Sequence, residues 1–219
     1  MASMTVTLSA RALLLDMDGT LVDSTPVVNR IWSEWAVDHD VDVEDVLHRA
    51  HGRQGHDVMA EFLPDRPQEE NVRENDLMLA REVAETEGIV EIPGAAEFLA
   101  SLAGLPHALV TSANEPLAAG RMAAAGLSLP SIAVMADDVA ASKPDPEGFL
   151  KAAGILGVDP ADCIVFEDSR AGITAARAAG MRVIGVGDAV AFEPDHVVPD
   201  LTAVTVTPTP DGVEVTVRS

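Results

Sequence analysis

Basic residues are scarce in this chain of 219 residues, which has 14 lysines and arginines against 36 aspartates and glutamates and a formal net charge of -22. So large a negative charge repels the phosphates of nucleic acids and anionic membrane surfaces, and we expect neither as a partner. A long apolar run is also lacking. No stretch reaches the ~18 residues of a membrane span, and the run Leu13–Leu15 is too short for a secretion signal before Asp16 ends it. We therefore expect a cytoplasmic protein, either a monomer or a small homo-oligomer.

Cysteine is nearly absent, because Cys163 is the only one, and this excludes an internal disulfide. Cys163 stands in the apolar run Cys163–Phe166 and is predicted to be a small core residue, since the sequence shows no histidine or helix start that would activate its thiol. The loop Gly-x-x-x-x-Gly-Lys-Ser/Thr, with which many kinases hold nucleotide phosphates, is missing as well. A kinase of that kind and a cysteine-dependent enzyme are therefore not expected.

What the chain does contain is a repeated alternation of short apolar runs and Ala-rich helical segments, with an apolar fraction of 47%. The predicted strands are Ala12–Leu15, Ala108–Val110, Ile132–Met135, Cys163–Phe166, Val183–Val186 and His196–Val198. The predicted helices lie within residues 95–103, 117–125, 149–153 and 171–179. Such alternation predicts an α/β fold with a Rossmann-like, doubly wound parallel sheet.

The interval 24–91 does not follow this alternation. It shows no convincing strand, and it carries 17 acidic and 6 basic residues, which is half of the net charge of the chain. Pro26 and the turn 92–94 mark its two ends. We expect an inserted helical cap domain at 24–91 and a catalytic core formed by residues 1–23 and 92–219. Trp32 and Trp35, three residues apart on one helix face, are expected to build the small core of this cap rather than to hold a ligand. The tail, 203–218, alternates Val and Thr around a Pro-Asp-Gly turn and predicts a hairpin.

The sequence Asp16-Met17-Asp18-Gly19-Thr20 follows directly after the first predicted strand. Because side chains alternate along an extended chain, Asp16 and Asp18 point the same way. Two carboxylates held that close are unfavourable unless a cation lies between them or one carries a proton. The pair indicates a magnesium site joined to an acid/base couple. Asp-Gly is also a common turn dipeptide, so a simple turn is the alternative.

Polar residues follow the other predicted strands too. Thr111 and Ser112 follow the second strand, Lys143 lies in the loop after the third, and the pair Glu167-Asp168 follows the fourth. Open α/β sheets bind ligands beyond the carboxyl ends of their strands, so these groups are predicted to meet at one edge. Each has a structural alternative, such as a helix cap for Thr111 or Ser112 or a surface position for Lys143. Their coincidence at one edge favours a site.

With these residues in this order, the chain resembles the haloacid-dehalogenase-type phosphohydrolases, a superfamily with four short motifs. The motifs stand here as Asp16–Thr20, Thr111, Lys143 with Pro144, and Glu167-Asp168, and the resemblance covers about residues 12–200. The insert after the first motif is similar to the small helical cap of the first cap class. Dehalogenases of the superfamily lack the second aspartate, so Asp18 favours the phosphatase branch.

The resemblance implies a role for each residue of these motifs. Asp16 would be the nucleophile that forms an aspartyl-phosphate, and Asp18 would be the general acid and base. Mg2+ would be held by Asp16, Asp168 and the backbone carbonyl of Asp18. Thr111 and the backbone N–H of Ser112 would hold phosphate oxygens, Lys143 would neutralise their charge, and Glu167 would orient Lys143 or a metal-bound water from behind.

Two segments bear on the substrate. The cap segment His51-Gly52-Arg53-Gln54-Gly55-His56-Asp57 resembles the cap loop of sugar-phosphate and glycerol-phosphate phosphatases. The stretch Thr111-Ser112-Ala113-Asn114-Glu115-Pro116 resembles that subgroup as well. Gly52 allows a tight loop and Arg53 can bind a phosphate or a polyol, although an ordinary interhelical turn would look similar. We expect a magnesium-dependent phosphatase of small sugar or polyol phosphates, with a small phosphorylated metabolite as its partner. A β-phosphoglucomutase-like phosphomutase, a phosphoglycolate phosphatase and a non-enzymatic scaffold remain alternatives.

Overall fold

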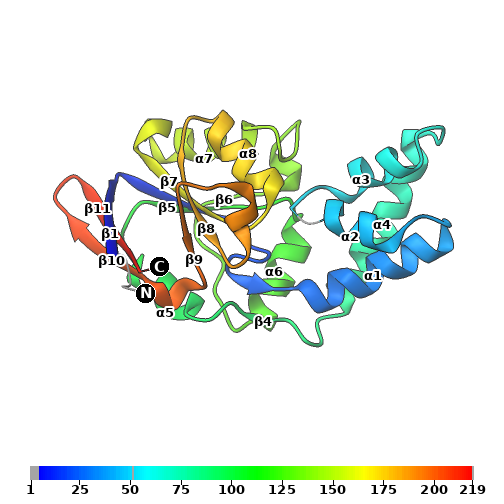
Figure 1. The fold of residues 1–219 in the computed structure, drawn as a ribbon, viewed down its shortest axis with the longest axis horizontal. Helices are drawn as coiled ribbons and strands as arrows, with labels where there is room; N and C mark the ends of the chain where they lie inside the picture. The colour runs from blue at the N-terminus through cyan, green and yellow to red at the C-terminus, as the bar shows by residue number, and fades with distance from the viewer. Residues whose placement is uncertain (1–4, 51, 219) are drawn as a thin grey trace.

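The computed structural model describes residues 5–50 and 52–218, and a six-stranded parallel sheet runs through its centre (Figure 1). The strands follow the order β6-β5-β2-β7-β8-β9 across the sheet. They are β2 (Ala12–Leu15), β5 (His107–Val110), β6 (Ala133–Val134), β7 (Cys163–Glu167), β8 (Arg182–Val186) and β9 (His196–Val198). Each pair of neighbours runs parallel. The predicted doubly wound α/β core is confirmed.

The sheet is buried on both faces, which explains why its strands are apolar throughout. Ala12 and Leu14 of β2 belong to one hydrophobic cluster, together with side chains of α7 (Glu147–Leu156) and α8 (Arg170–Ala178). Leu13 and Leu15 point the other way, into the cluster that contains side chains of α5 (Ala95–Ser101) and α6 (Glu115–Ala124). Alternating side chains of one strand thus bind two layers of helices to the sheet.

The strand order brings distant parts of the chain to one point. From the central strand β2 the chain crosses to β5 and β6, and it then returns to β7 on the other side of β2. Leu15 is in register with both Leu109 of β5 and Phe166 of β7. The residues that follow these three strands are therefore neighbours in space, at the kind of topological switch point where α/β sheets bind ligands.

Four helices lie beside the sheet, at the right of Figure 1, and we call them the cap. They are α1 (Thr25–Asp38), α2 (Val43–Ala50), α3 (Gly55–Phe62) and α4 (Gln68–Ala84). Two short strands, β3 (Val22–Asp23) and β4 (Val90–Glu91), pair antiparallel at the point where the chain enters and leaves these helices. A strand at 90–91 was not expected from the sequence, because two residues are too few to show a pattern. The domain boundaries given above remain a prediction.

The two tryptophans of α1 pack as the sequence predicts. Trp32 and Trp35 are both buried, and their rings meet edge to face with centroids 5.4 Å apart. Trp35 also makes an edge contact with Phe62 of α3. The pair thus connects two cap helices through an aromatic core, and Trp32 also lines the cavity described below.

A second, three-stranded antiparallel sheet contains both ends of the described chain. It consists of β10 (Val204–Thr209), β11 (Gly212–Arg218) and β1 (Thr5–Ala10), in the order β1-β11-β10. The predicted hairpin is confirmed as β10 and β11. The strand β1 was not predicted. Its apolar residues alternate with threonine and serine, a pattern that becomes a strand only through its partner β11, two hundred residues away.

The structure bears on the expectations for Cys163 and for membrane-spanning segments. Cys163 is buried at the start of β7, and burial raises the pKa of its thiol to about 11, which suits a core residue and not a nucleophile. Across residues 5–50 and 52–218, none of the helices combines the length and the apolar character that crossing a membrane requires. The cellular compartment and the oligomeric state remain predictions.

Candidate active site

The loop after β2 passes close to Asp168 at Gly19. Gly19 has φ +85°, and a Cβ atom at this position would lie 2.0 Å from Oδ2 of Asp168. The turn itself is closed by hydrogen bonds from Leu21 and Val22 to the carbonyl of Met17. The glycine therefore lets the loop pass close to Asp168. Asp16 and Asp168, which are 152 positions apart in the sequence, come together at the edge of the sheet.

Asp16, Glu167 and Asp168 form a cluster in which one ligand atom from each residue lies within 4.8 Å of the others. Burial, opposed by the charge of Lys143 and aided by the neighbouring carboxylate of Glu167, raises the pKa of Asp16 to about 8. Burial also raises the pKa of Asp168, with the charges of Glu167 and Asp16 adding to the rise. Carboxylate oxygens that repel one another in a buried place are the donor set that a hard divalent cation stabilises. The residues present thus fit a metal ion.

Lys143 supplies positive charge to the same cluster. Its Nζ donates hydrogen bonds to Asp16 and, over 2.8 Å, to Oε1 of Glu167. Burial by itself would lower the pKa of Lys143, but these two carboxylates raise it above its usual value, so the ammonium stays charged. The other oxygen of Glu167 accepts hydrogen bonds from the backbone and the hydroxyl of Ser169. Both oxygens of Glu167 thus accept hydrogen bonds, one from Lys143 and the other from Ser169, and its role in orienting Lys143 remains a prediction.

Asp18 lies in different surroundings, although only one residue separates it from Asp16. Its Oδ1 accepts a hydrogen bond of 2.6 Å from Ser24, and its Oδ2 makes an ion pair of 2.8 Å with Arg121. Its side chain is 25% exposed, whereas that of Asp16 is 6% exposed. The two carboxylates therefore have different surroundings, since Asp16 lies inside the buried charged cluster whereas Asp18 is held by Ser24 and Arg121.

The segment after β5 contributes polar groups to the region around Asp16 and Asp18. The hydroxyl oxygen of Thr111 accepts a hydrogen bond from the backbone of Ala113, and Oδ1 of Asn114 caps α6 by accepting one from the backbone of Leu117. Ser112 donates its hydroxyl to the backbone carbonyl of Gly52 over 3.0 Å. Helix capping, the structural alternative for this stretch, is thus the role of Asn114 and not of Thr111 or Ser112.

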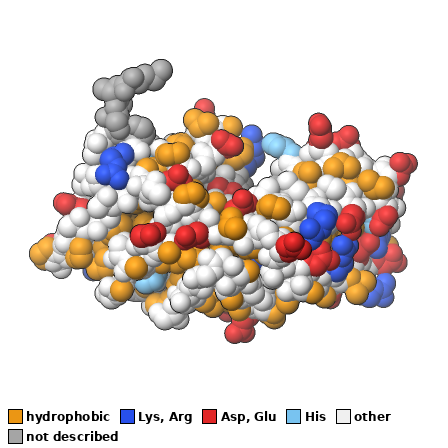
Figure 2. Space-filling view, turned by 90° about the horizontal axis from the view of Figure 1, so that it is seen from below, with side chains coloured by type: hydrophobic (Ala, Val, Ile, Leu, Met, Phe, Trp, Pro, Cys, Tyr) orange, Lys and Arg blue, Asp and Glu red, His pale blue; other side chains and the backbone are white. Residues whose placement is uncertain are grey.

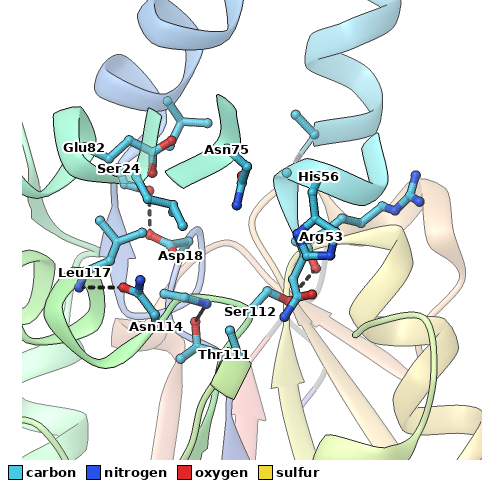
Figure 3. Close-up of a pocket in the computed structure, with 18 of the residues that line it drawn as sticks. Asp18, Ser24, Arg53, His56, Asn75, Glu82, Thr111, Ser112, Asn114 and Leu117 are labelled. Atoms are coloured by element: carbon cyan, nitrogen blue, oxygen red, sulfur yellow. Dashed lines mark hydrogen bonds between the residues drawn. The ribbon is translucent and has the colours of Figure 1, made fainter. Parts of the chain in front are cut away.

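A cavity of about 300 Å³ lies between the core and the cap. Figure 3 shows Asn75 and His56 of the cap on one side and Thr111 and Ser112 of the core on the other. The residues that line it include Asp16, Asp18, Ser24, Val28, Trp32, Gly52, Arg53, Gln54, His56, Asn75, Asp76, Glu82, Thr111, Ser112, Ala113, Asn114 and Arg121. It opens directly over Asp16 and Asp18 and is large enough for a small metabolite.

The predicted cap loop borders this cavity. Gly52 has φ +77°, and a Cβ atom there would lie 2.3 Å from Oγ of Ser169, so the loop touches the core at this glycine. Arg53 also lines the cavity, but its guanidinium donates a hydrogen bond of 2.7 Å to Glu61. His51 lies outside the described residues. The substrate roles of these residues remain predictions.

Two important residues of the site were not found from the sequence. Arg121, on α6, and Glu82, on α4, are both buried and joined by an ion pair of 2.5 Å. One signal was available for Arg121. The buried face of α6 contains Leu117, Ala118 and Met122, and the spacing of these residues places Arg121 on the same face. An arginine at a core position is rarely buried without a carboxylate partner.

Comparison with known proteins agrees with this geometry. Residues 10–180 match the sequence model of the haloacid dehalogenase-like hydrolases. Hexitol phosphatase A of Escherichia coli (strain K12) is 40% identical over 209 residues, covering 92% of this chain and 96% of that protein. Glycerol-1-phosphate phosphohydrolase 2 of Saccharomyces cerevisiae is 35% identical over 192 residues, covering 83% of this chain and 76% of that protein.

Among solved structures, a hydrolase from Pseudomonas syringae superposes with a TM-score of 0.74 and 26% identity, over 86% of this chain and 93% of that one. The predicted enzyme class, a phosphoric monoester hydrolase, and the predicted sugar- and polyol-phosphatase subgroup are confirmed by these similarities. The chain belongs to the haloacid dehalogenase-like hydrolase family.

Proposed function

We propose that this protein is a magnesium-dependent phosphatase that hydrolyses phosphate monoesters of small, otherwise uncharged sugars or polyols. One observation carries the proposal. The charged cluster around Asp16 and Lys143 opens into a cavity whose described arginines, Arg53 and Arg121, are already paired with carboxylates. The cavity wall beyond the cluster therefore offers hydrogen bonds to hydroxyl groups more readily than it offers a second site for an anion.

The metal ion would be held by the carboxylates of Asp16 and Asp168 and by the backbone carbonyl of Asp18. Bound there, Mg2+ would supply positive charge that offsets the repulsion between a phosphate and the attacking carboxylate. The side chain of Asp18 is engaged by Ser24 and Arg121 instead, which supports the prediction that this residue contributes its backbone.

The residues of the core would divide the reaction between them. Asp16 attacks the phosphorus and forms an aspartyl-phosphate as the ester P–O bond breaks, while Asp18, in its protonated form, gives that proton to the leaving oxygen. Asp18 then takes a proton from the water that hydrolyses this intermediate. Thr111 and the backbone N–H of Ser112 hold phosphate oxygens, and the charged Lys143 stabilises the negative charge on them in the transition state.

The cap would select the alcohol part of the substrate. Asn75 reaches the cavity from α4, and His56 and Gln54 reach it from the start of α3. These side chains can both donate and accept hydrogen bonds, as hydroxyl groups do. Hexitol and glycerol phosphates, named in the two relatives above, have leaving alcohols of this kind.

The arginines of the cap support an uncharged alcohol as well. Figure 2 shows arginine and acidic side chains close together at the surface of the cap end of the molecule. Arg30 pairs with Glu85, Arg81 with Glu34 and Glu85, and Arg66 with Glu70 and Glu74. These ion pairs lie outside the cavity, and none of their residues lines it.

A phosphomutase has less support. It shares the core residues, but it must hold a second phosphate in the cap, and a phosphoglycolate phosphatase must hold a carboxylate there. Arg53 is the cap arginine best placed for either, and Glu61 competes for its guanidinium. The mutase remains the second candidate because it would use the same core residues.

The proposal can be tested by measuring phosphate release from a panel of esters, with Mg2+ and with EDTA. The panel contains hexitol, glycerol, hexose, pentose and deoxysugar phosphates, phosphoglycolate, and β-glucose 1-phosphate with and without its bisphosphate. We expect Mg2+-dependent release concentrated on the sugar and polyol phosphates. Formation of glucose 6-phosphate without free phosphate would identify a mutase, and a preference for phosphoglycolate would contradict an uncharged leaving alcohol.

A further inference from the structure

The carboxylate of Asp18 is held by two donors that belong to different parts of the molecule. Ser24, directly before α1, donates to Oδ1 over 2.6 Å, and Nη1 of Arg121 pairs with Oδ2 over 2.8 Å. Figure 3 shows Asp18 with Ser24 and Glu82 above it, at the wall of the cavity. A carboxylate that is held at both oxygens has little freedom to rotate.

Arg121 in turn is held by the cap. Its Nη2 donates to Oε2 of Glu82, and the side chains of Arg121 and Glu82 are 5% and 8% exposed. Arg121 is on α6 of the core and Glu82 is on α4 of the cap, so this ion pair exists only while α4 lies against α6. The three residues form a continuous chain from a cap helix to the side chain that faces the substrate.

We propose that Glu82 and Arg121 are positioning residues, which align the carboxylate of Asp18 for proton transfer only while the cap is closed over the core. This inference rests on the proposed function, because it assigns Asp18 the proton-transfer role there. Closure of the cap places Glu82 beside Arg121, and Arg121 then fixes Asp18. With the cap apart from the core, Arg121 loses Glu82, the partner that sets the direction of its guanidinium, and it no longer holds Asp18 in one orientation.

The inference predicts a dependence on the leaving group. A sugar or polyol alkoxide is a poor leaving group and needs a proton, whereas 4-nitrophenolate leaves without one. Loss of the alignment should therefore slow the first step for a polyol phosphate and spare that step for 4-nitrophenyl phosphate. The second step uses Asp18 as a base with either substrate, so the aryl ester should give a burst of nitrophenolate followed by slow turnover.

The experiment measures the first turnover by rapid quench, with Mg2+, for glycerol 1-phosphate and for 4-nitrophenyl phosphate. For Arg121→Met we expect the first step to fall about 10–100-fold with the glycerol ester and less than about threefold with the aryl ester, because Asp18 stays in place and only part of the roughly 10²–10⁴-fold that a general acid contributes is lost. For Glu82→Gln, which keeps a hydrogen-bond acceptor, we expect the same preference with a smaller loss. Arg81→Met, on the same helix as Glu82 but at the surface, is the matched control and should behave as wild type.

A second variant guards against misfolding, because Arg121→Met leaves Glu82 buried without its partner. The double variant Arg121→Met/Glu82→Met replaces the ion pair by apolar side chains, an exchange that proteins often tolerate. It should show the same leaving-group dependence. Equal losses with both esters, or no loss, would overturn the positioning role while wild-type turnover keeps the proposed function. Absence of wild-type turnover of both esters, and of the wider panel, would overturn the proposed function and this inference together.

Discussion

Core and cap handle charge in opposite ways. In the core, Asp16, Asp168 and Glu167 gather with Lys143 in a buried cluster, and burial raises the pKa of both aspartates. In the cap, acidic residues pair with arginines near solvent, and a hydrogen bond from Arg53 lowers the pKa of Glu61. The core cluster thus holds three carboxylates against one lysine, whereas the cap pairs join arginines to carboxylates near solvent. This difference indicates that the core supplies the chemistry and the metal site and that the cap supplies shape and hydrogen bonds.

The largest effect should come from breaking the core cluster at its nucleophile. Asp16→Asn removes the attacking carboxylate, so we expect turnover to fall by roughly 10⁴-fold or more, as for other nucleophile removals. The fold should persist, because the change removes one of several repelling carboxylates while Lys143 keeps its bond to Glu167. Phosphate release measures the first effect and thermal unfolding the second. Residual activity near the wild-type rate would show that another residue is the nucleophile.

The core cluster could be predicted from the sequence because short sequence patterns identify the positions of its residues. Asp16 and Glu167 stand directly at the ends of apolar runs, and the rule that parallel strands share an edge brings them together without knowledge of any contact. The pair formed by Glu82 and Arg121 has no such rule. It depends on how α4 packs against α6, and the two residues are 39 positions apart in the sequence. The same limit applies to β1, whose pairing with β11 depends on the opposite end of the chain.

A second, smaller effect tests whether the cap must touch the core. In Gly52→Ala the new Cβ would meet Oγ of Ser169, and the loop would have to move away from the core. Displacements of about 1 Å near a reacting group can lower rates about 10²-fold, so we expect kcat/KM for a polyol phosphate to fall roughly 10–100-fold.

The matched control for this change is Gly126→Ala. Gly126 also has a positive φ, of +73°, but a Cβ atom there would meet no atom within 4 Å. Both variants should lose about 1 kcal/mol of stability from the strained backbone. Only Gly52→Ala should lose activity. Equal kinetics in the two variants would show that contact between the cap loop and the core is not needed for turnover.

The smallest effect should come from Arg53, the cap arginine that borders the cavity. Because Glu61 already engages its guanidinium, Arg53→Ala should remove about one hydrogen bond to the substrate, and we expect KM for a polyol phosphate to rise roughly tenfold. KM for 4-nitrophenyl phosphate should change less than about twofold. Arg49→Ala is the control, since Arg49 pairs with the same Glu61 and does not line the cavity in the described structure. A similar rise for both esters would make the loop a structural turn. If Arg53→Ala instead strongly lowered only the rate of bisphosphate-dependent isomerisation, this cap arginine would bind a second phosphate. The cap would then supply charge to the reaction, contrary to the contrast drawn above.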